Sequence, residues 1–244
     1  MKTLILGTAA LALTAGLAWA DGHGKTVRMG TEGAYPPYNF INDNGEIDGF
    51  EREVGDELCK RAQLHCEWVK NDWDSIIPNL VSGNYDTIIA GMSITAERDE
   101  VIDFTQNYVP PSPSLFVAAS DGIDTLTGVI AAQTGTLQAG YVAESGATLV
   151  EFATPDETIA AVRSGEADAV LADGDFLVPL VEESNGELIF VGKPVSLGMG
   201  VGMGLRESDT ELREKFDAAI TSMKEDGSLN DLLAKWFEDD NLRY

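Results

Sequence analysis

Basic residues, histidine and cysteine are all scarce in this chain of 244 residues. The 16 lysine and arginine residues face 41 aspartate and glutamate residues, which gives a formal net charge of -25. Such an acidic surface argues against nucleic acid and anionic membranes as partners, because both carry negative charge themselves. The carboxylates either keep the chain soluble or attract cations, and composition alone leaves both interpretations open.

Long apolar runs are absent from the sequence after its first twenty residues. Within those twenty, Lys2 precedes an apolar run from Leu4 to Leu17, and Ala18-Trp19-Ala20 follows. A basic start, a short apolar stretch and an A-x-A pattern are typical of a secretory signal peptide, and the run is too short to span a membrane. We expect residues 1–20 to be removed by cleavage after Ala20, which leaves the product in an oxidising compartment.

The two cysteines, Cys59 and Cys66, form an even pair in a chain expected to be secreted. That context favours a disulfide, with two free buried thiols as the alternative. Their spacing is not C-x-x-C, and His65 beside Cys66 does not complete a zinc site. The other histidine, His23, lies in the N-terminal tail, so no residues suggest a nucleophile with its base. We therefore expect no metal, no cofactor and no catalytic residues.

Apolar patterning divides the chain into two series of strands and helices. The first series has predicted strands at 26–30, 67–69 and 86–90, an Asn-Gly hairpin at 38–50 and helices at 50–62 and 76–81. The second has predicted strands at 115–119, 129–132, 149–152, 167–172 and 187–191 and a helix at 157–164. Strands that alternate with helices indicate open parallel α/β sheets.

Two irregular segments separate these series. Residues 107–113 are rich in proline and are unsuited to a helix or a central strand. Residues 198–204 have glycine at every second position, which fails the dinucleotide-binding fingerprint and favours a flexible crossover. Residues 208–211 then fit a capping box that begins the first of two final helices. We expect two α/β lobes joined by two crossovers, formed by residues 21–109 with 199–244 and by residues 110–198.

Polar and aromatic residues follow the predicted strands at their carboxyl ends, where ligands bind in open α/β sheets. A bound amino acid needs a bidentate cation for its carboxylate and an acceptor for its ammonium. Arg98 suits the first role and Asp173 the second, while Glu32 suits a distal positive charge on the ligand. Tyr35 and Trp73 can sandwich the ligand side chain, and their faces favour a cationic one by about 0.5–2 kcal/mol.

Each of these residues also has a simpler interpretation. Arg98 alone fits a solvated residue near a helix cap, and Glu32 and Asp173 alone fit exposed loop carboxylates. The two aromatic residues fit ordinary, partly buried side chains, so only the joint placement at successive strand ends favours a binding site. The complete predicted site is Glu32, Tyr35, Trp73, Ala90, Gly91, Ser93, Arg98, Thr136, Leu137 and Asp173.

Several longer motifs carry a resemblance to a known family. They are GTEGAYPPY (30–38), ELCKRAQLHC (57–66), DWDSIIPNL (72–80), SITAER (93–98), DFT (103–105), GMGLR (202–206) and DGSL (226–229). At these residues the chain resembles the polar amino-acid-binding proteins of the bacterial extracellular solute-binding proteins, family 3. Within that family it is most similar to the lysine/arginine/ornithine- and histidine-binding periplasmic proteins, over nearly the whole chain after the predicted signal peptide.

The resemblance implies a periplasmic-binding-protein (Venus-flytrap) fold, with two hinged lobes of mostly parallel sheet flanked by helices. It implies that Arg98 holds the ligand carboxylate, that Asp173 holds the ammonium, and that Cys59 and Cys66 form a disulfide. The expected function is periplasmic capture of a cationic L-amino acid, arginine first and then lysine, ornithine or histidine. The expected partner is the inner-membrane permease of an ABC importer, and we expect the protein to act as a monomer.

Three positions depart from the subgroup that the chain resembles. Ala90 stands where serine is usual and Leu137 where threonine is usual, which removes two hydroxyl groups from the expected cleft. Glu32 is one methylene longer than the usual aspartate, so the preference for the ligand side chain stays open. The alternatives are a binder of another polar amino acid or an opine-type conjugate, and a periplasmic dehydratase on the same scaffold.

Overall fold

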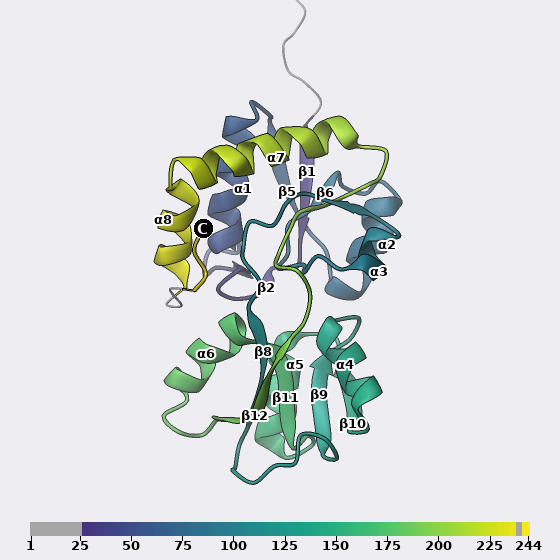
Figure 1. Cartoon of the computed structure of the whole chain (residues 1–244), viewed down its shortest axis with the longest axis vertical. Helices are drawn as coiled ribbons and strands as arrows, with labels where there is room; N and C mark the ends of the chain where they lie inside the picture. The colour runs from purple at the N-terminus through teal and green to yellow at the C-terminus, as the bar shows by residue number, and fades with distance from the viewer. Residues whose placement is uncertain (1–25, 238–240) are drawn as a thin grey trace, which may run out of the picture.

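The computed structural model describes residues 26–237 and 241–244, and the expected signal peptide lies outside these ranges. Strands and helices gather into two bodies that are joined by two extended segments (Figure 1). In the described part of the chain, no helix is both long and apolar enough to cross a membrane.

The first body contains a five-stranded sheet with the strand order β5-β1-β6-β13-β7. Its strands are β5 (Cys66–Lys70), β1 (Val27–Thr31), β6 (Thr87–Ile88), β13 (Gly204–Leu205) and β7 (Asp103–Phe104). A smaller sheet follows β1 and consists of β2 (Ala34–Tyr35), β3 (Asn39–Ile41) and β4 (Ile47–Asp48). The helices of this body are α1 (Phe50–Arg61), η1 (Trp73–Ser75), α2 (Ile76–Val81), α3 (Ala96–Asp99), α7 (Thr210–Glu225) and α8 (Ser228–Trp236).

The second body contains a five-stranded sheet with the order β10-β9-β11-β8-β12. Its strands are β10 (Thr148–Phe152), β9 (Val129–Gln133), β11 (Ala169–Asp173), β8 (Pro113–Ala118) and β12 (Ile189–Ser196). Its helices are α4 (Leu137–Ser145), α5 (Pro155–Ser164) and α6 (Gly174–Glu183).

Both large sheets are mixed, whereas the sequence favoured mostly parallel sheets. In the first, β1 is parallel to β5 and β6, and β13 is antiparallel to β6 and β7. In the second, β9 is parallel to β10 and β11, and β8 is antiparallel to β11 and β12. The antiparallel pairs arise where the crossovers enter or leave a sheet, so the two-body α/β architecture expected from the sequence is otherwise confirmed.

Local sequence explains where α5 begins and ends. The Thr154 hydroxyl accepts a hydrogen bond from the backbone of Glu157, and the Glu157 carboxylate accepts one from the backbone of Thr154, which completes a capping box. Pro155 occupies the first turn, and Gly165 ends the helix in a left-handed conformation with φ 78°. The helix that begins here packs against β9.

Two local predictions in these regions need correction. The capping box predicted at 208–211 is wrong, because the Asp209 side chain makes no capping bond to α7 and the Ser208 hydroxyl donates to the Asp209 carboxylate instead. The proline-rich segment does reach a strand, since Pro113 is the first residue of β8. A proline is tolerated there because the first position of a strand can lack an N–H donor.

The two crossovers lie side by side, a contact that the sequence did not predict. Val201 pairs in antiparallel fashion with both Ser93 and Val109. Gly200 has φ 88°, and a Cβ atom there would lie 2.6 Å from the carbonyl oxygen of Val109. Glycine at this position therefore allows the crossovers to touch.

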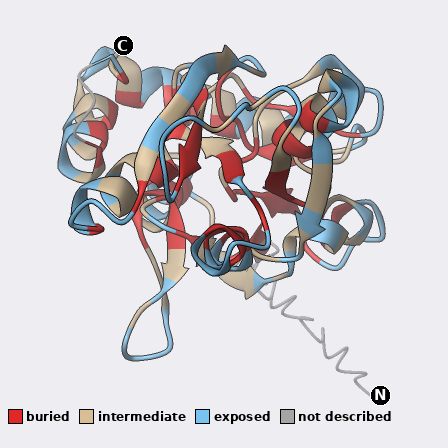
Figure 2. Ribbon diagram, turned by 90° about the horizontal axis from the view of Figure 1, so that it is seen from below, coloured by how far each residue is buried: buried red, intermediate tan, exposed pale blue. Residues whose placement is uncertain are grey.

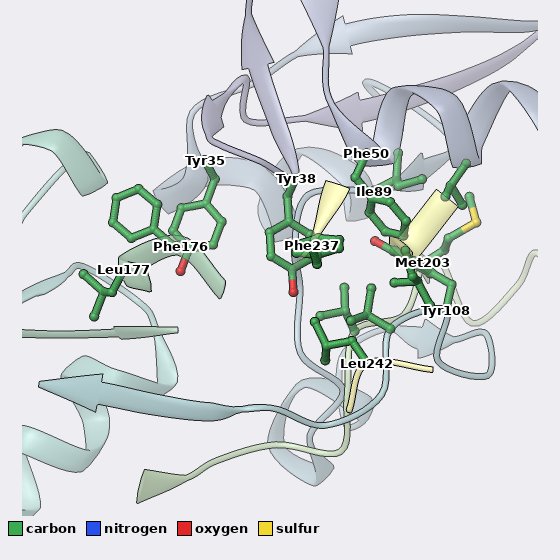
Figure 3. Packing of buried hydrophobic residues seen from close by; sticks show 14 of the residues in the cluster. Tyr35, Tyr38, Phe50, Ile89, Tyr108, Phe176, Leu177, Met203, Phe237 and Leu242 are labelled. Carbon is green, nitrogen blue, oxygen red and sulfur yellow. The ribbon is translucent and has the colours of Figure 1, made fainter. Parts of the chain in front are cut away.

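Buried residues lie in strands such as β1, β9 and β11 and on one side of helices such as α1 and α7, while many loop residues are exposed (Figure 2). The largest core cluster crosses from one body to the other, because Tyr35 of the first body stacks on Phe176 of the second (Figure 3). On the first body, Cys59 and Cys66 form a disulfide with their Cα atoms 6.3 Å apart, which confirms the predicted pairing.

Candidate ligand-binding site

One cavity lies between the two bodies and is lined by residues from both. All ten residues predicted for the site line it: Glu32, Tyr35, Trp73, Ala90, Gly91, Ser93, Arg98, Thr136, Leu137 and Asp173. Six residues that the sequence did not single out complete the lining: Gln133, Gln138, Pro155, Thr158, Leu171 and Ala172.

Arg98 lies on α3 and reaches across the boundary between the bodies. The Thr95 hydroxyl caps this short helix by accepting a hydrogen bond from the backbone N–H of Arg98, at 3.1 Å. The guanidinium donates to the carbonyl of Ser93 at 2.9 Å and to that of Gly135, on the second body, at 3.4 Å. It also lies 5.4 Å from the ring centroid of Trp73. Burial lowers the pKa of Arg98 to about 10, so the group stays cationic at neutral pH.

Asp173 is the last residue of β11 and faces Arg98 from the second body. Its carboxylate accepts hydrogen bonds from the Tyr35 hydroxyl at 2.8 Å and from the Gln138 amide at 2.7 Å. Burial and the neighbouring Asp175 raise the pKa of Asp173 to about 6, against the opposing effects of Arg98 and these hydrogen bonds. Arg98 and Asp173 thus form one end of the cavity, with a cation and a carboxylate that act on each other.

Glu32 follows β1 and forms a second charged part of the cavity. Its side chain is 4% exposed, and Gln133 of the second body donates a 2.6 Å hydrogen bond to it. Burial raises the pKa of Glu32 to about 7, although the bond from Gln133 and the charge of Lys70 act in the opposite direction. Lys70, Asp72 and Glu51 are the charges that act on Glu32, whereas Asp175 and Arg98 act on Asp173, so the cavity contains two carboxylates with different charged neighbours.

The two predicted aromatic walls both line the cavity and both have protein partners. The Tyr35 ring stacks on Phe176 at 4.7 Å between centroids (Figure 3). Trp73 faces the guanidinium of Arg98. Their sandwiching of a ligand side chain stays a prediction, and the structure adds that each also holds a part of the site in place.

The remaining predicted residues contribute backbone and shape. The N–H of Gly91 donates to the Glu51 carboxylate at 2.6 Å, so it is already engaged within the protein. Thr136 caps α4, and its hydroxyl donates to the carbonyl of Gln133. Ala90 is almost fully buried, and Leu137 begins α4. At positions where the subgroup that the chain resembles usually carries hydroxyl groups, these two residues present apolar side chains.

The sequence carried a signal for some of the missed residues. Gln133 is the last residue of β9, so the strand-end rule that identified Asp173 applies to it equally. Gln138 lies in the first turn of α4, a helix that the apolar pattern did not predict. Pro155 and Thr158 lie in the first turn of α5, whose start the sequence placed two residues late.

Residues 27–239 match the bacterial extracellular solute-binding proteins, family 3. The chain belongs to this family. A relative from Escherichia coli, the lysine/arginine/ornithine-binding periplasmic protein, is 32% identical over 257 residues, covering 98% of each chain. The octopine-binding periplasmic protein of Rhizobium meliloti is 31% identical, covering 98% of this chain and 99% of its own.

A solved structure is much more similar in sequence. It is a periplasmic His/Glu/Gln/Arg/opine family-binding protein from Silicibacter pomeroyi in complex with lysine, 80% identical, with a TM-score of 0.86. It covers 88% of this chain and 98% of its own. The chain described in this structure is therefore a solute-binding protein, and its named relatives are binding proteins rather than enzymes. Their names also place them in the periplasm, which supports the same location here.

Proposed function

We propose that this protein captures a cationic L-amino acid, with lysine and arginine foremost, and delivers it to an ABC importer. The observation that carries the proposal is a single cavity with a charged clamp at one end and a buried carboxylate at the other. Relatives are named for lysine, arginine and ornithine, and the 80% identical structure holds lysine. These names support the ligand class and leave the order of preference to measurement.

The clamp suits the groups that all α-amino acids share. The Arg98 guanidinium matches a carboxylate with two parallel N–H donors, which a lysine side chain does not offer. The Asp173 carboxylate matches the α-ammonium. Since these two residues belong to different bodies, a ligand that touches both favours the closed arrangement of the lobes.

Glu32 suits a group that only basic ligands carry. A carboxylate buried to this degree is unfavourable when ionised, and a distal ammonium or guanidinium restores its electrostatic balance. A neutral side chain of the same length offers no such compensation. Glu32 therefore serves as the selector for charge, and the Arg98–Asp173 pair serves as the general amino-acid clamp.

We also propose how the mature protein is organised. One lobe is formed by residues 21–109 with 199–244 and the other by residues 110–198, and the signal peptide is cleaved after Ala20. The mature protein acts as a monomer and docks on a permease in the inner membrane. Mass spectrometry of secreted protein tests the cleavage, and light scattering tests the monomer.

Calorimetry on ligand-free protein tests the ligand class. The panel contains the twenty amino acids, ornithine, citrulline, norleucine and octopine. We expect lysine, arginine and ornithine to bind far more tightly than norleucine and citrulline, which share their length without the distal charge. Preference for a neutral amino acid or for octopine over all three cations would overturn the proposal.

A further inference from the structure

Gln133 links the two charged ends of the cavity. It is the last residue of β9, and its side chain is 8% exposed. Its backbone carbonyl accepts the Thr136 hydroxyl at 2.6 Å, beside the amino-acid clamp. Its side-chain amide crosses to the first body and donates to Glu32, 101 positions away in the sequence, at 2.6 Å.

The orientation of the Gln133 amide is determined by its neighbours. The nitrogen donates both to the Glu32 carboxylate and, at 3.1 Å, to the backbone carbonyl of Ala153. The carbonyl of Ala153 can only accept hydrogen bonds, so the nitrogen must face it and the two amide groups cannot be exchanged. Both N–H bonds of the amide are therefore used within the protein.

What the amide still offers a ligand is its oxygen, which can only accept. We propose that Gln133 is a specificity-determining residue of the distal subsite, where its amide oxygen and the Glu32 carboxylate together accept the N–H groups of a cationic ligand. This inference rests on the proposed function, because it concerns the same cavity. It adds a neutral second acceptor, supplied by the opposite lobe, to the charge of Glu32.

Two acceptors, one from each lobe, predict a ligand preference that the charge of Glu32 alone does not predict. An ammonium or guanidinium carries several N–H donors, and a single carboxylate does not satisfy them all in a desolvated pocket. With Gln133 in place, donors are met from both lobes, so the closed state is favoured most by ligands with a distal N–H cation. The bond from Gln133 also lowers the pKa of Glu32, which keeps more of the carboxylate ionised.

The test is Gln133→Met, which keeps the length of the side chain and removes both hydrogen-bonding groups. Calorimetry measures lysine and norleucine, which differ only in the distal amine. We expect the lysine affinity to fall by about ten- to a hundredfold, the loss for a hydrogen bond to a charged group, while norleucine changes by less than about threefold. The pH at which lysine binding reaches half its maximum should also move upward, because Glu32 loses a donor.

Gln138→Met is the matched control, with the same substitution at the other end of the cavity. Gln138 donates to Asp173, which contacts the part of the ligand that lysine and norleucine share. It should weaken both ligands by the same factor and leave the pH profile of the lysine-to-norleucine ratio unchanged. Thermal unfolding of both variants reports whether they fold.

The outcomes separate this inference from the proposed function. If the unmodified protein binds no cationic amino acid, the proposed function fails. If it binds lysine selectively but Gln133→Met keeps that selectivity, or weakens lysine and norleucine equally, the proposed function stands and the role of Gln133 is overturned.

Discussion

The hydroxyl of Tyr35 donates a 2.8 Å hydrogen bond to the carboxylate of Asp173, and the two residues lie 138 positions apart in the sequence. Tyr35 belongs to the first body and Asp173 ends a strand of the second. The bond therefore exists only while the two bodies lie together. It also lowers the pKa of Asp173, whose raised value of about 6 comes mainly from burial.

Removing this hydroxyl with Tyr35→Phe should weaken amino-acid binding in a pH-dependent way. Without the bond, the pKa of Asp173 rises further toward neutrality, so a larger fraction of the carboxyl is protonated and no longer pairs with an ammonium. We expect a loss of about three- to tenfold at pH 7 for lysine and norleucine alike, larger at pH 6 and smaller at pH 8. Calorimetry at the three pH values measures it.

Tyr38→Phe provides the control for that experiment. The Tyr38 hydroxyl donates to Asp175, also at 2.8 Å, and Asp175 does not line the ligand cavity. This variant loses a comparable bond between the bodies but removes no hydrogen-bond donor from Asp173. Equal pH dependence in both variants would show that the contact acts only by holding the bodies together.

Protonation of Glu32 should make the selectivity for cationic ligands depend on pH near neutrality. Its pKa of about 7 means that the carboxyl is largely neutral at pH 6 and largely ionised at pH 8. Only the ionised form attracts a distal cation, so the lysine affinity should rise between these values by up to about tenfold for each pH unit below 7. Calorimetry in buffers of different ionisation enthalpy should also detect protons released on binding.

The ratio of lysine to norleucine affinity isolates Glu32 from Asp173, because Asp173 acts on both ligands. Glu32→Gln should lower lysine and arginine affinity strongly, leave citrulline nearly unchanged and flatten the pH profile of this ratio. One change among so many acidic residues barely alters the long-range field. If arginine affinity is untouched in this variant, the distal charge is recognised elsewhere.

The strand-end rule selected residues that line one cavity because it depends only on the order of elements along the chain. Glu32, Arg98 and Asp173 each follow or end a strand, and the topology then brings them to one cavity. The disulfide was predicted on a different ground, because Cys59 and Cys66 are an even pair in a chain expected to be secreted.

Contacts between the lobes lay beyond such reasoning. The partner of Glu32 is Gln133, on the other body, and no periodicity or spacing relates residues 101 positions apart. Gln138 was missed because the apolar residues of α4 form only a weak stripe along the helix. The sequence therefore predicted no helix over residues 137–145. The sequence did predict a strand at 115–119, which corresponds to β8, but not its antiparallel direction, and it did not predict β13. The direction of both strands depends on how the crossovers return.

Arg98 should be required for the binding of every amino acid, whereas Glu32 should be required only for the binding of cationic ones. Arg98→Ala removes a charged donor from the clamp, and losses of this kind correspond to about tens- to thousands-fold in affinity. Lysine and norleucine should lose equal factors, because both present the same carboxylate. Arg98→Lys should fall between, since it keeps the charge but loses the planar fork. A changed lysine-to-norleucine ratio in either variant would place Arg98 at the wrong end of the ligand.

The disulfide should stabilise the fold without affecting binding. Cys66 pairs with Val27 at the amino end of the parallel strands, whereas Glu32 follows their carboxyl end. Replacing both cysteines with alanine opens a loop with a sequence separation of 7, which should lower the free energy of unfolding by about 2–3 kcal/mol. Denaturant unfolding measures this loss, and calorimetry should find the lysine affinity unchanged. A large loss of affinity in a folded variant would contradict the separation of bridge and site.

Gly200 should control closure from outside the cavity. Its φ of 88° is unfavourable for other residues, and an added Cβ would lie 2.6 Å from the carbonyl oxygen of Val109 on the adjacent crossover. Gly200→Ala should therefore push the crossovers apart and disfavour the closed arrangement. We expect lysine and norleucine to weaken by the same factor, because the cavity residues are unchanged, with about 1–3 kcal/mol lost from stability.

Small-angle scattering shows whether this loss arises from closure. The unmodified protein should have a smaller radius of gyration with lysine than without it, and Gly200→Ala should need much more lysine to reach the same contraction. Gly45→Ala is the control, because Gly45 has a similar φ of 79° but no atom within 4 Å of an added Cβ. It carries the backbone strain without the contact between crossovers, so its ligand affinity should match that of the unmodified protein. If Gly45→Ala weakens lysine as much as Gly200→Ala does, general destabilisation explains both, and the touching crossovers do not govern closure.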